Sequence, residues 1–251
     1  MQRKTEDKIA RYSRQILLSE VGSGGQEKIN NAAILLIGAG GLGSSCAYYL
    51  AAAGVGVLGI ADDDTVEMSN LNRQILHSEG GIGKPKAISA KETLSAFNPH
   101  VTVRTYPYRL SSESPFEEEV DGYDLLIDCT DNYETRYRIN DICIKKKKPW
   151  IFGAVSEFEG QVMTIIPGKS PCYRCLYPSA TLSGRIPAVL GVTPGVIGIL
   201  QATEALKYIL DTGNLLTGRF LHADLKDMQF DVFRLTRNVN CPSCAGLFKS
   251  G

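Results

Sequence analysis

The sequence predicts an α/β fold with a Rossmann-like, mostly parallel sheet that is extended by antiparallel strands and carries a structural four-cysteine zinc site. In the first half of the chain, apolar runs alternate with segments of helical spacing, which indicates βαβ units and a parallel sheet. In the second half, pairs of extended runs indicate antiparallel strands. Two Cys-x-x-Cys pairs have the spacing of zinc knuckles.

Length and composition fit a single globular domain over residues 1–251, which we divide into the halves 1–150 and 151–251. Hydrophobic residues make up 43% of the chain and charged residues 22%, which excludes a disordered or fibrous protein. The 27 Lys and Arg residues balance 27 Asp and Glu residues, which argues against binding to nucleic acid or to a membrane surface. We find neither a transmembrane pattern nor a secretory signal, and therefore expect a cytoplasmic protein.

The elements of the first half follow from local patterns. The run 32–37 is wholly apolar, as expected for a strand that is buried on both faces. Gly54 suits the position after the end of a helix, and Pro85 suits the first position of the next one. We expect strands at 32–37, 55–61, 101–106 and 124–128, and helices at 44–53, 84–98 and from 133 to the lysine run 145–148.

The second half is expected to extend the sheet. Residues 150–166 contain two extended runs around 158–160, and the runs 219–224 and 228–235 form a further pair around 225–227. A helix is expected to begin with Thr193 as its N-cap and Pro194 as its first residue, and to end before Gly213. The segment 176–192 has weak periodicity and is expected to cross the surface as a loop.

A glycine-rich turn predicts a nucleotide site. The sequence Gly38-Ala39-Gly40-Gly41-Leu42-Gly43 joins the first strand to a helix, where glycines allow close backbone approach and the helix N-terminus faces an anion. Asp62 ends the next strand about 20 residues on, where a carboxylate would hold a ribose, and Asp64 follows it. A turn without a ligand is the plain alternative, and the turn alone does not distinguish ATP from NAD.

Cationic residues after the second strand favour a triphosphate. Lys86 lies in the first turn of a helix, where its charge opposes the helix dipole at a cost of several tenths of a kcal/mol. A solvated lysine is the plain interpretation, but a polyphosphate between the ammonium and the helix end explains the position better. NAD has only a diphosphate, so Lys86 and Arg73 favour ATP. Arg73 is accompanied by the polar residues Ser69, Asn70 and Asn72.

The end of the fourth strand supplies a candidate magnesium ligand. The sequence Asp128-Cys129-Thr130-Asp131-Asn132 stands where an open α/β sheet binds its ligand. Because Mg²⁺ takes one or two carboxylates together with phosphate oxygens, Asp131 is the candidate. The alternative is that Asp131 or Thr130 caps the next helix, and the spacing favours neither interpretation.

The cysteines predict a structural metal. Two knuckles of this spacing form a tetrahedral site with every position filled, which would fasten the C-terminus to the body of the protein. A redox role for one pair is the alternative. The expected zinc ligands are Cys172, Cys175, Cys241 and Cys244. Free cysteine is usually buried, so we expect packing roles for Cys46, Cys129 and Cys143.

The motifs occur in the order of one family. They are RYSRQILL (11–18), GAGGLG (38–43), ADDDTVEMSNLNRQ (61–74), GKPKA (83–87), FNPH (97–100), DCTDN (128–132), GQ (160–161), PCYRC (171–175) and CPSC (241–244). Over nearly its whole length the chain resembles the ThiF/MoeB/HesA adenylyltransferases, bacterial relatives of ubiquitin-activating enzymes. The resemblance implies ATP-dependent adenylation of the C-terminal Gly-Gly carboxylate of a small ubiquitin-like sulfur-carrier protein, with release of pyrophosphate. It also implies Mg²⁺, structural Zn²⁺, a homodimer and a molybdopterin- or thiamine-type pathway.

The resemblance also assigns residues. Gly41 would lie against the nucleotide, Asp62 would bind its ribose and Asp131 would bind Mg²⁺. Arg14, in the first motif, would reach the phosphates of the neighbouring subunit. The expected catalytic residues are Arg14, Arg73, Lys86 and Asp131. The expected cofactor-binding residues are Gly38, Gly40, Gly41, Gly43, Asp62, Asp64, Ser69, Asn70, Asn72, Arg73, Lys86, Asp131 and Asn132.

One departure from the family concerns cysteine chemistry. Many relatives use a cysteine in the crossover segment after the first knuckle, but here no cysteine occurs between Cys175 and Cys241. We therefore expect adenylation without a covalent cysteine step, with Cys129 as the one fallback nucleophile. The competing hypotheses are an NAD-dependent oxidoreductase, adenylation of a different carboxylate, and a non-catalytic docking module.

Overall fold

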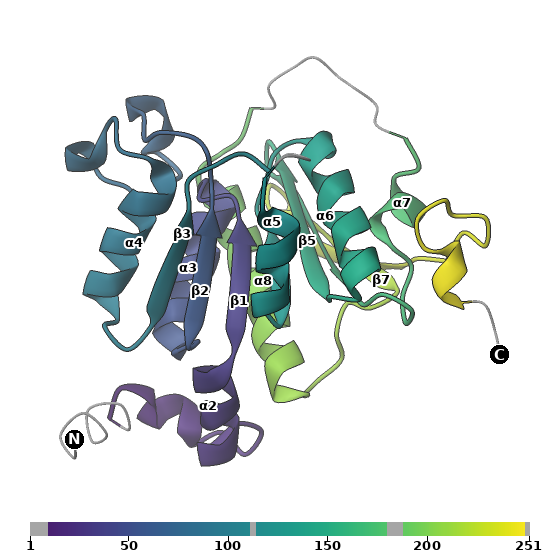
Figure 1. The fold of residues 1–251 in the computed structure, drawn as a ribbon, viewed down its shortest axis with the longest axis horizontal. Helices are drawn as coiled ribbons and strands as arrows, with labels where there is room; N and C mark the ends of the chain where they lie inside the picture. The colour runs from purple at the N-terminus through teal and green to yellow at the C-terminus, as the bar shows by residue number, and fades with distance from the viewer. Residues whose placement is uncertain (1–9, 111–113, 180–187, 249–251) are drawn as a thin grey trace.

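One sheet organises the molecule. The computed structural model describes residues 10–110, 114–179 and 188–248. Within them the strands form one eight-stranded sheet in the order β3-β2-β1-β4-β5-β6-β7-β8 (Figure 1). The strands from β3 to β5 pair in parallel and those from β5 to β8 pair antiparallel. The predicted fold class is confirmed.

The element boundaries lie close to the predicted ones. The strands are β1 (Ala33–Ile37), β2 (Val57–Ala61), β3 (Thr102–Tyr106), β4 (Leu125–Asp128), β5 (Trp150–Ser156), β6 (Glu159–Ile165), β7 (Arg219–Asp224) and β8 (Gln229–Arg234). Residues 10–16 are helical, and the α-helices that follow are α2 (Gly22–Asn31), α3 (Gly41–Ala53), α4 (Lys86–Phe97), α5 (Phe116–Glu119), α6 (Tyr133–Lys146), α7 (Tyr173–Leu176) and α8 (Val192–Leu210). Short 3-10 helices lie at Met68–Asn70, Glu79–Gly81, Val120–Gly122 and Ala245–Phe248.

The apolar run of β1 is explained by two cores. Ile34 and Leu36 belong to a core on one face of the sheet, together with residues of α3, α4 and α8. Leu35 and Ile37 belong to a core on the other face, together with residues of α5, α6 and α7. Helices cover both faces of the sheet, so every residue of the strand needs an apolar side chain, whichever face it points to.

The sheet order places a crevice at β1. β1 lies between β2 and β4, so the chain runs outward to one side after β1 and returns to the other side at β4. Open α/β sheets bind ligands at such a switch point, outside the carboxyl ends of the strands. Figure 1 shows α2 at the opposite end of the sheet, where β1 begins.

Several local predictions need correction. α8 begins one residue before Thr193, because Gly191 takes the capping position and the Thr193 hydroxyl bonds to the Glu157 carbonyl instead. Pro85 precedes α4 as its N-cap rather than serving as its first residue. The β5–β6 turn falls earlier than expected. Glu157 already has the left-handed φ of 51°, and β6 starts at Glu159.

Other parts were not predicted or are not described. α2 was not predicted, because its sequence GSGGQEKINN is rich in glycine and has a weak apolar pattern. Of the expected loop 176–192, residues 180–187 lie outside the described part of the chain. Among the described residues, we find no helix with the length and apolarity needed to cross a bilayer.

Candidate functional site

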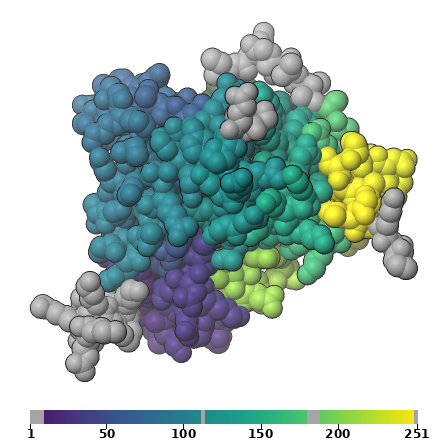
Figure 2. Space-filling model, in the orientation of Figure 1, coloured from purple at the N-terminus to yellow at the C-terminus, as the bar shows by residue number. Residues whose placement is uncertain are grey.

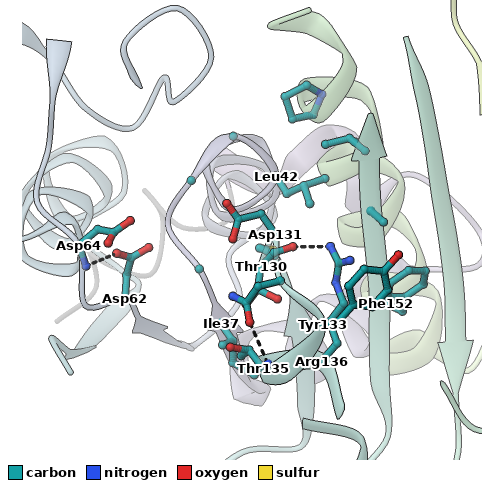
Figure 3. A pocket seen from close by; sticks show the side chains of 18 of the residues that line it. Ile37, Leu42, Asp62, Asp64, Thr130, Asp131, Tyr133, Thr135, Arg136 and Phe152 are labelled. Atoms are coloured by element: carbon teal, nitrogen blue, oxygen red, sulfur yellow. Dashed lines mark hydrogen bonds between the residues drawn. The ribbon is translucent and has the colours of Figure 1, made fainter. Parts of the chain in front are cut away.

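A cavity of about 800 Å³ opens at the carboxyl ends of β1, β2 and β4 (Figure 3). It lies at the switch point of the sheet, as open α/β folds place their ligands. Residues from the turn after β1, the end of β2, the start of α4 and the loop after β4 meet there. The predicted site residues that line it are Gly38, Gly40, Gly41, Asp62, Asp64, Arg73, Lys86, Asp131 and Asn132.

The glycine turn is shaped by close backbone approach. Gly38 has a φ of +102°, and a Cβ there would stand 2.6 Å from the carbonyl oxygen of Cys129. A Cβ on Gly43 would stand 2.0 Å from the carbonyl oxygen of Gly38, so Gly43 brings the helix onto the strand and does not line the cavity. The N-terminus of the 13-residue helix α3 therefore faces the cavity with free N–H groups, which suits an anion.

The central peptide of the turn is held on both sides. Asp62 accepts hydrogen bonds from the Ala39 N–H at 2.7 Å and from the Asp64 N–H at 2.9 Å. Burial raises the pKa of Asp62, and the Ala39 bond opposes that rise. The Ala39 carbonyl lies 2.9 Å from Nε2 of His77, whose Nδ1 lies 3.0 Å from the Ser89 hydroxyl. Burial lowers the pKa of His77, which favours the neutral ring.

Two cations line one side of the cavity. The Lys86 ammonium lies 2.8 Å from the Asp64 carboxylate, and the two side chains are 7% and 69% exposed. Because Asp64 can turn into solvent, an incoming phosphate can take its place beside Lys86. Arg73 donates from Nη1 to the Ser69 carbonyl at 2.9 Å and to Oδ1 of Asn72 at 3.0 Å. Ser69 and Asn72 thus orient Arg73 and do not themselves line the cavity.

The loop after β4 leaves Asp131 free. Asn132, rather than Asp131 or Thr130, caps α6, because its Oδ1 accepts the Thr135 N–H at 2.9 Å (Figure 3). Asp131 is exposed at the cavity, and among the described residues it has neither a hydrogen bond nor an ion pair. A free carboxylate at a cavity lined by cations is an oxygen ligand of the kind that Mg²⁺ takes.

Sequence reasoning missed Arg136, which also lines this cavity. Its Nη2 donates to the Thr130 carbonyl at 2.6 Å, and its Nε lies 3.3 Å from Oδ2 of Asp128. Burial raises the pKa of Asp128, and the Arg136 guanidinium opposes that rise. A signal was available, since position 136 lies one helical turn after the cap at Asn132 and therefore on the side of the strand ends.

The four knuckle cysteines converge. Their Sγ atoms all lie within 4.8 Å of one another, with 3.5 Å between those of Cys172 and Cys241 and 3.6 Å between those of Cys175 and Cys244. A zinc–sulfur distance of about 2.3 Å puts tetrahedral sulfurs about 3.8 Å apart, so the cluster fits zinc. Figure 2 shows the C-terminal segment, which carries the second knuckle, as a lobe at the edge of the molecule.

Helix α6 supports both knuckles. Asp141 accepts hydrogen bonds from Nε and Nη2 of Arg174 at 3.2 and 2.9 Å, and from the Ser243 hydroxyl at 2.8 Å. Arg174 belongs to the first Cys-x-x-Cys and Ser243 to the second. Asn140 adds a bond from the Tyr173 N–H to its Oδ1 at 3.0 Å. One turn of α6 therefore joins segments that are far apart in the sequence.

Comparison with known proteins identifies the family. The family model described as "ThiF family" matches residues 12–243. The chain belongs to the ThiF family. It is 44% identical over 241 residues to the SAMP-activating enzyme E1 of Haloferax volcanii, covering 94% of this chain and 88% of that protein. It is 43% identical over 252 residues to the sulfur carrier protein adenylyltransferase of Thermus thermophilus, covering 96% and 93%.

A longer relative agrees with this ThiF-family assignment, and a solved structure shares the fold. The chain is 42% identical over 247 residues to the adenylyltransferase and sulfurtransferase MOCS3 of Drosophila persimilis, and the match covers 96% of this chain but 54% of that one. The crystal structure of E. coli MccB with ATP has the same fold, with a TM-score of 0.82 at 23% identity, covering 94% of this chain and 74% of that one.

The remaining predicted residues of this ThiF-family chain lie outside the cavity. Asn70 is nearly buried and caps the 3-10 helix that follows Glu67, with its Oδ1 accepting the Glu67 N–H at 3.3 Å. Arg14 is exposed and lies two residues after Tyr12, which packs against Gly54 at the far end of α3. Since the cavity is at the other end of α3, Arg14 does not reach it within one chain.

The three remaining cysteines are packing residues, as predicted. Cys46, Cys129 and Cys143 are all buried. Cys129 borders the cavity, but burial raises the pKa of its thiol well above the ordinary value. A buried thiol with a raised pKa holds little thiolate, and the thiolate is the nucleophilic form.

Proposed function

We propose that this ThiF-family chain uses ATP to adenylate the C-terminal carboxylate of a small ubiquitin-like sulfur-carrier protein. The main support for this proposal is that a glycine turn at a helix N-terminus, two cations and a free carboxylate line the same cavity. The names of two relatives above 40% identity, a SAMP-activating enzyme and a sulfur carrier protein adenylyltransferase, support the same reaction class. The cations and the family favour this function over an NAD-dependent oxidoreductase.

The chemistry needs positioning more than acid–base catalysis. The attacking carboxylate is already ionised at neutral pH, so no general base is required. One of its oxygens attacks the α-phosphorus, the bond to the β-phosphate oxygen breaks, and pyrophosphate leaves with the electron pair. The product is a mixed anhydride of carrier and AMP. The anionic carboxylate must approach the anionic phosphates of ATP. Arg73 and Lys86 would therefore accelerate the reaction mainly by neutralising the charge of the phosphates.

Each end of the nucleotide has a place in this proposal. Asp62 would accept hydrogen bonds from the ribose hydroxyls, since its carboxylate is held at the cavity by two backbone N–H groups. Gly40 and Gly41, at the start of α3, would lie against the phosphates. Asp131 would hold Mg²⁺, which would supply positive charge to offset the negative charge of the phosphates.

The cysteine cluster has a structural role in this proposal. Its four sulfurs would hold Zn²⁺ with every coordination position filled, which leaves no place for a substrate. The buried Cys129 and the lack of cysteine between the knuckles support a reaction that stops at the adenylate, with sulfur supplied by another protein. A carrier–enzyme conjugate that a thiol reductant releases would contradict this.

We also propose a homodimer in which Arg14 reaches the phosphates of the neighbouring subunit. Its exposure and its distance from its own cavity support a role across an interface. Mixed dimers of Arg14→Ala and Asp131→Ala subunits test this, because one intact site forms only if Arg14 acts on the neighbour. Cytoplasmic location and the division at residue 150 stay predictions.

Pyrophosphate–ATP exchange tests the function directly. We expect exchange of labelled pyrophosphate into ATP only with ATP, Mg²⁺ and a carrier that ends in Gly-Gly. The matched control is the same carrier with its terminal carboxylate amidated, which cannot form the anhydride. Equal exchange with the amidated carrier, or exchange driven by a small carboxylic acid alone, would contradict the proposal, and nicotinamide cofactor binding in its place would favour the oxidoreductase.

A further inference from the structure

The loop of residues 129–132, which carries Asp131, is held in place by buried polar groups at the end of β4 and on α8. The fully buried Asp128 accepts hydrogen bonds at Oδ1 from the Thr130 N–H at 3.0 Å and from the Thr130 hydroxyl at 2.6 Å. Its backbone carbonyl accepts a bond from Nε2 of Gln201, on α8, at 2.6 Å. These contacts fix the residues on the N-terminal side of Asp131.

Arg136 fixes the same loop from the side of α6. Nη2 donates to the Thr130 carbonyl at 2.6 Å, as drawn in Figure 3, and to the Gly153 carbonyl of β5 at 3.4 Å. The guanidinium carbon also lies 5.4 Å from the centre of the Phe152 ring. A planar guanidinium can hold several acceptors in fixed directions, which an ammonium cannot do.

Asp131 is thereby left between two fixed neighbours. On one side the Thr130 carbonyl, which belongs to the peptide bond of Asp131, is bonded to Arg136. On the other side Asn132 is held as the cap of α6. The direction of the Asp131 side chain therefore depends on the peptide that Arg136 holds.

The charge of Arg136 is already balanced. Its Nε lies 3.3 Å from Oδ2 of Asp128, and the two side chains are 9% and 0% exposed. Asp128 has no path into solvent, so it cannot leave Arg136 to a phosphate. Lys86 differs, because its partner Asp64 is 69% exposed and can turn away. The Arg136–Asp128 pair has no net charge and therefore attracts an anion only weakly. Lys86 attracts an anion more strongly, because its partner can move away.

We propose that Arg136 is a positioning residue. It holds the Thr130 carbonyl so that the Asp131 carboxylate points into the cavity, where it would bind the divalent cation of the nucleotide. Arg136 does not bind phosphate itself. This inference rests on the proposed function, which places a divalent cation on Asp131.

Two variants and one control test it. Arg136→Lys keeps the positive charge beside Asp128 but loses the planar group whose Nη2 reaches both carbonyls while its Nε faces Asp128. The paired change Asp128→Asn with Arg136→Gln removes both charges together, so neither is left buried alone if the single variant is unstable. Arg138→Lys, on the same helix but outside the cavity, is the matched control. Thermal unfolding shows which variants are folded.

Three measurements separate positioning from phosphate binding. They are the ATP dissociation constant without divalent cation, the Mn²⁺ affinity of the ATP complex, and the turnover of pyrophosphate exchange. For Arg136→Lys and for the paired variant we expect unchanged metal-free ATP binding, Mn²⁺ affinity weakened about tenfold, and turnover lowered by up to about 100-fold. Arg138→Lys should match the unsubstituted protein in all three.

Two results would overturn the proposal. A tenfold loss of metal-free ATP affinity would make Arg136 a phosphate-binding group, and an unchanged Mn²⁺ affinity would remove it from the positioning of Asp131. If the unsubstituted protein shows no exchange with any carrier, the proposed function fails, but the Mn²⁺ measurement still decides the role of Arg136.

Discussion

The cavity and the cysteine cluster are assembled in different ways. The cavity collects its charged groups from segments that are well separated in the sequence, and only the sheet brings these segments together. The cluster collects two short motifs, each of which already places its own two cysteines close together. Substitutions in the cavity should therefore remove chemistry and spare stability, whereas those around the cluster should release the metal and spare the chemistry.

The largest effect is expected from Asp131→Ala. The variant should lower pyrophosphate exchange by about 10²–10³, the size seen when one transition-state charge contact is removed. Because Asp131 is exposed and unpaired among the described residues, the free energy of unfolding should change by less than about 0.5 kcal/mol. Exchange assays and thermal unfolding measure these two quantities, and metal analysis checks whether the cysteine cluster keeps its metal.

The control for that substitution is Asp227→Ala, at an exposed position in the turn between β7 and β8. It removes the same charge outside the cavity and should leave exchange unchanged. Retained exchange in Asp131→Ala would remove Asp131 from the mechanism, and loss of metal from the cysteine cluster would mean that the two regions are not independent.

A smaller effect is expected from Asp141→Ala, which cuts the support shared by both knuckles. Groups that orient metal ligands commonly change metal affinity by about 10–100-fold, and the side chain of Asp141 is 49% exposed, so we expect about tenfold faster metal release. Release to a coloured chelator measures the rate. Exchange measured before any metal has left should stay normal.

Asp121→Ala is the matched control for the cluster. Asp121 also pairs with a basic residue, Lys146, at 2.6 Å, and its side chain is 58% exposed, but it contacts neither knuckle. Equal release rates in the two variants would show that the loss of a surface ion pair, rather than the support of the knuckles, explains the result.

The smallest effect is a pH dependence from His77. Burial lowers the pKa of this ring, so between that lowered value and about 6.5 the unfolded chain binds a proton that the folded chain does not. Stability should therefore fall as the pH falls through this window, by up to about 1.4 kcal/mol per pH unit. Urea unfolding at pH 7.5 and 5.5 measures the drop.

His77→Gln should reduce that drop, because glutamine does not titrate and its amide can still donate to the Ala39 carbonyl. His100→Gln, at a half-buried position outside the cavity, should keep the full drop. Equal drops in both variants would show that the pH dependence arises elsewhere in the molecule.

The fold was largely predictable because its signals are local. Alternating apolar runs, the Gly54 helix end and the two hairpins all report on a few neighbouring residues, and the structure has them close to the predicted positions. α2 was missed because its glycine-rich sequence has little helical preference. Tertiary packing, rather than local preference, stabilises this helix.

The candidate site was predictable in part. Asp62 follows the end of β2 and Lys86 is the first residue of α4, positions where motif spacing is informative, and both line the cavity. The contacts of Arg136 were missed because its helical spacing from Asn132 indicates only that it lies near the strand ends, whereas its partner Asp128 and its acceptor at Gly153 lie on different strands. Asn70 was predicted to bind the cofactor, yet its side chain caps a short helix, which spacing alone does not distinguish from ligand binding.

By itself, the sequence determined the sheet type, the glycine turn and the two cysteine motifs, because backbone preference and ligand spacing act over a few residues. Only the tertiary structure decided which residue caps α6, which cation is neutralised by a buried carboxylate, and how Asp141 joins the two knuckles. These depend on burial and on distances between segments up to about a hundred residues apart, and a charge has its effect only in the surroundings that the fold gives it.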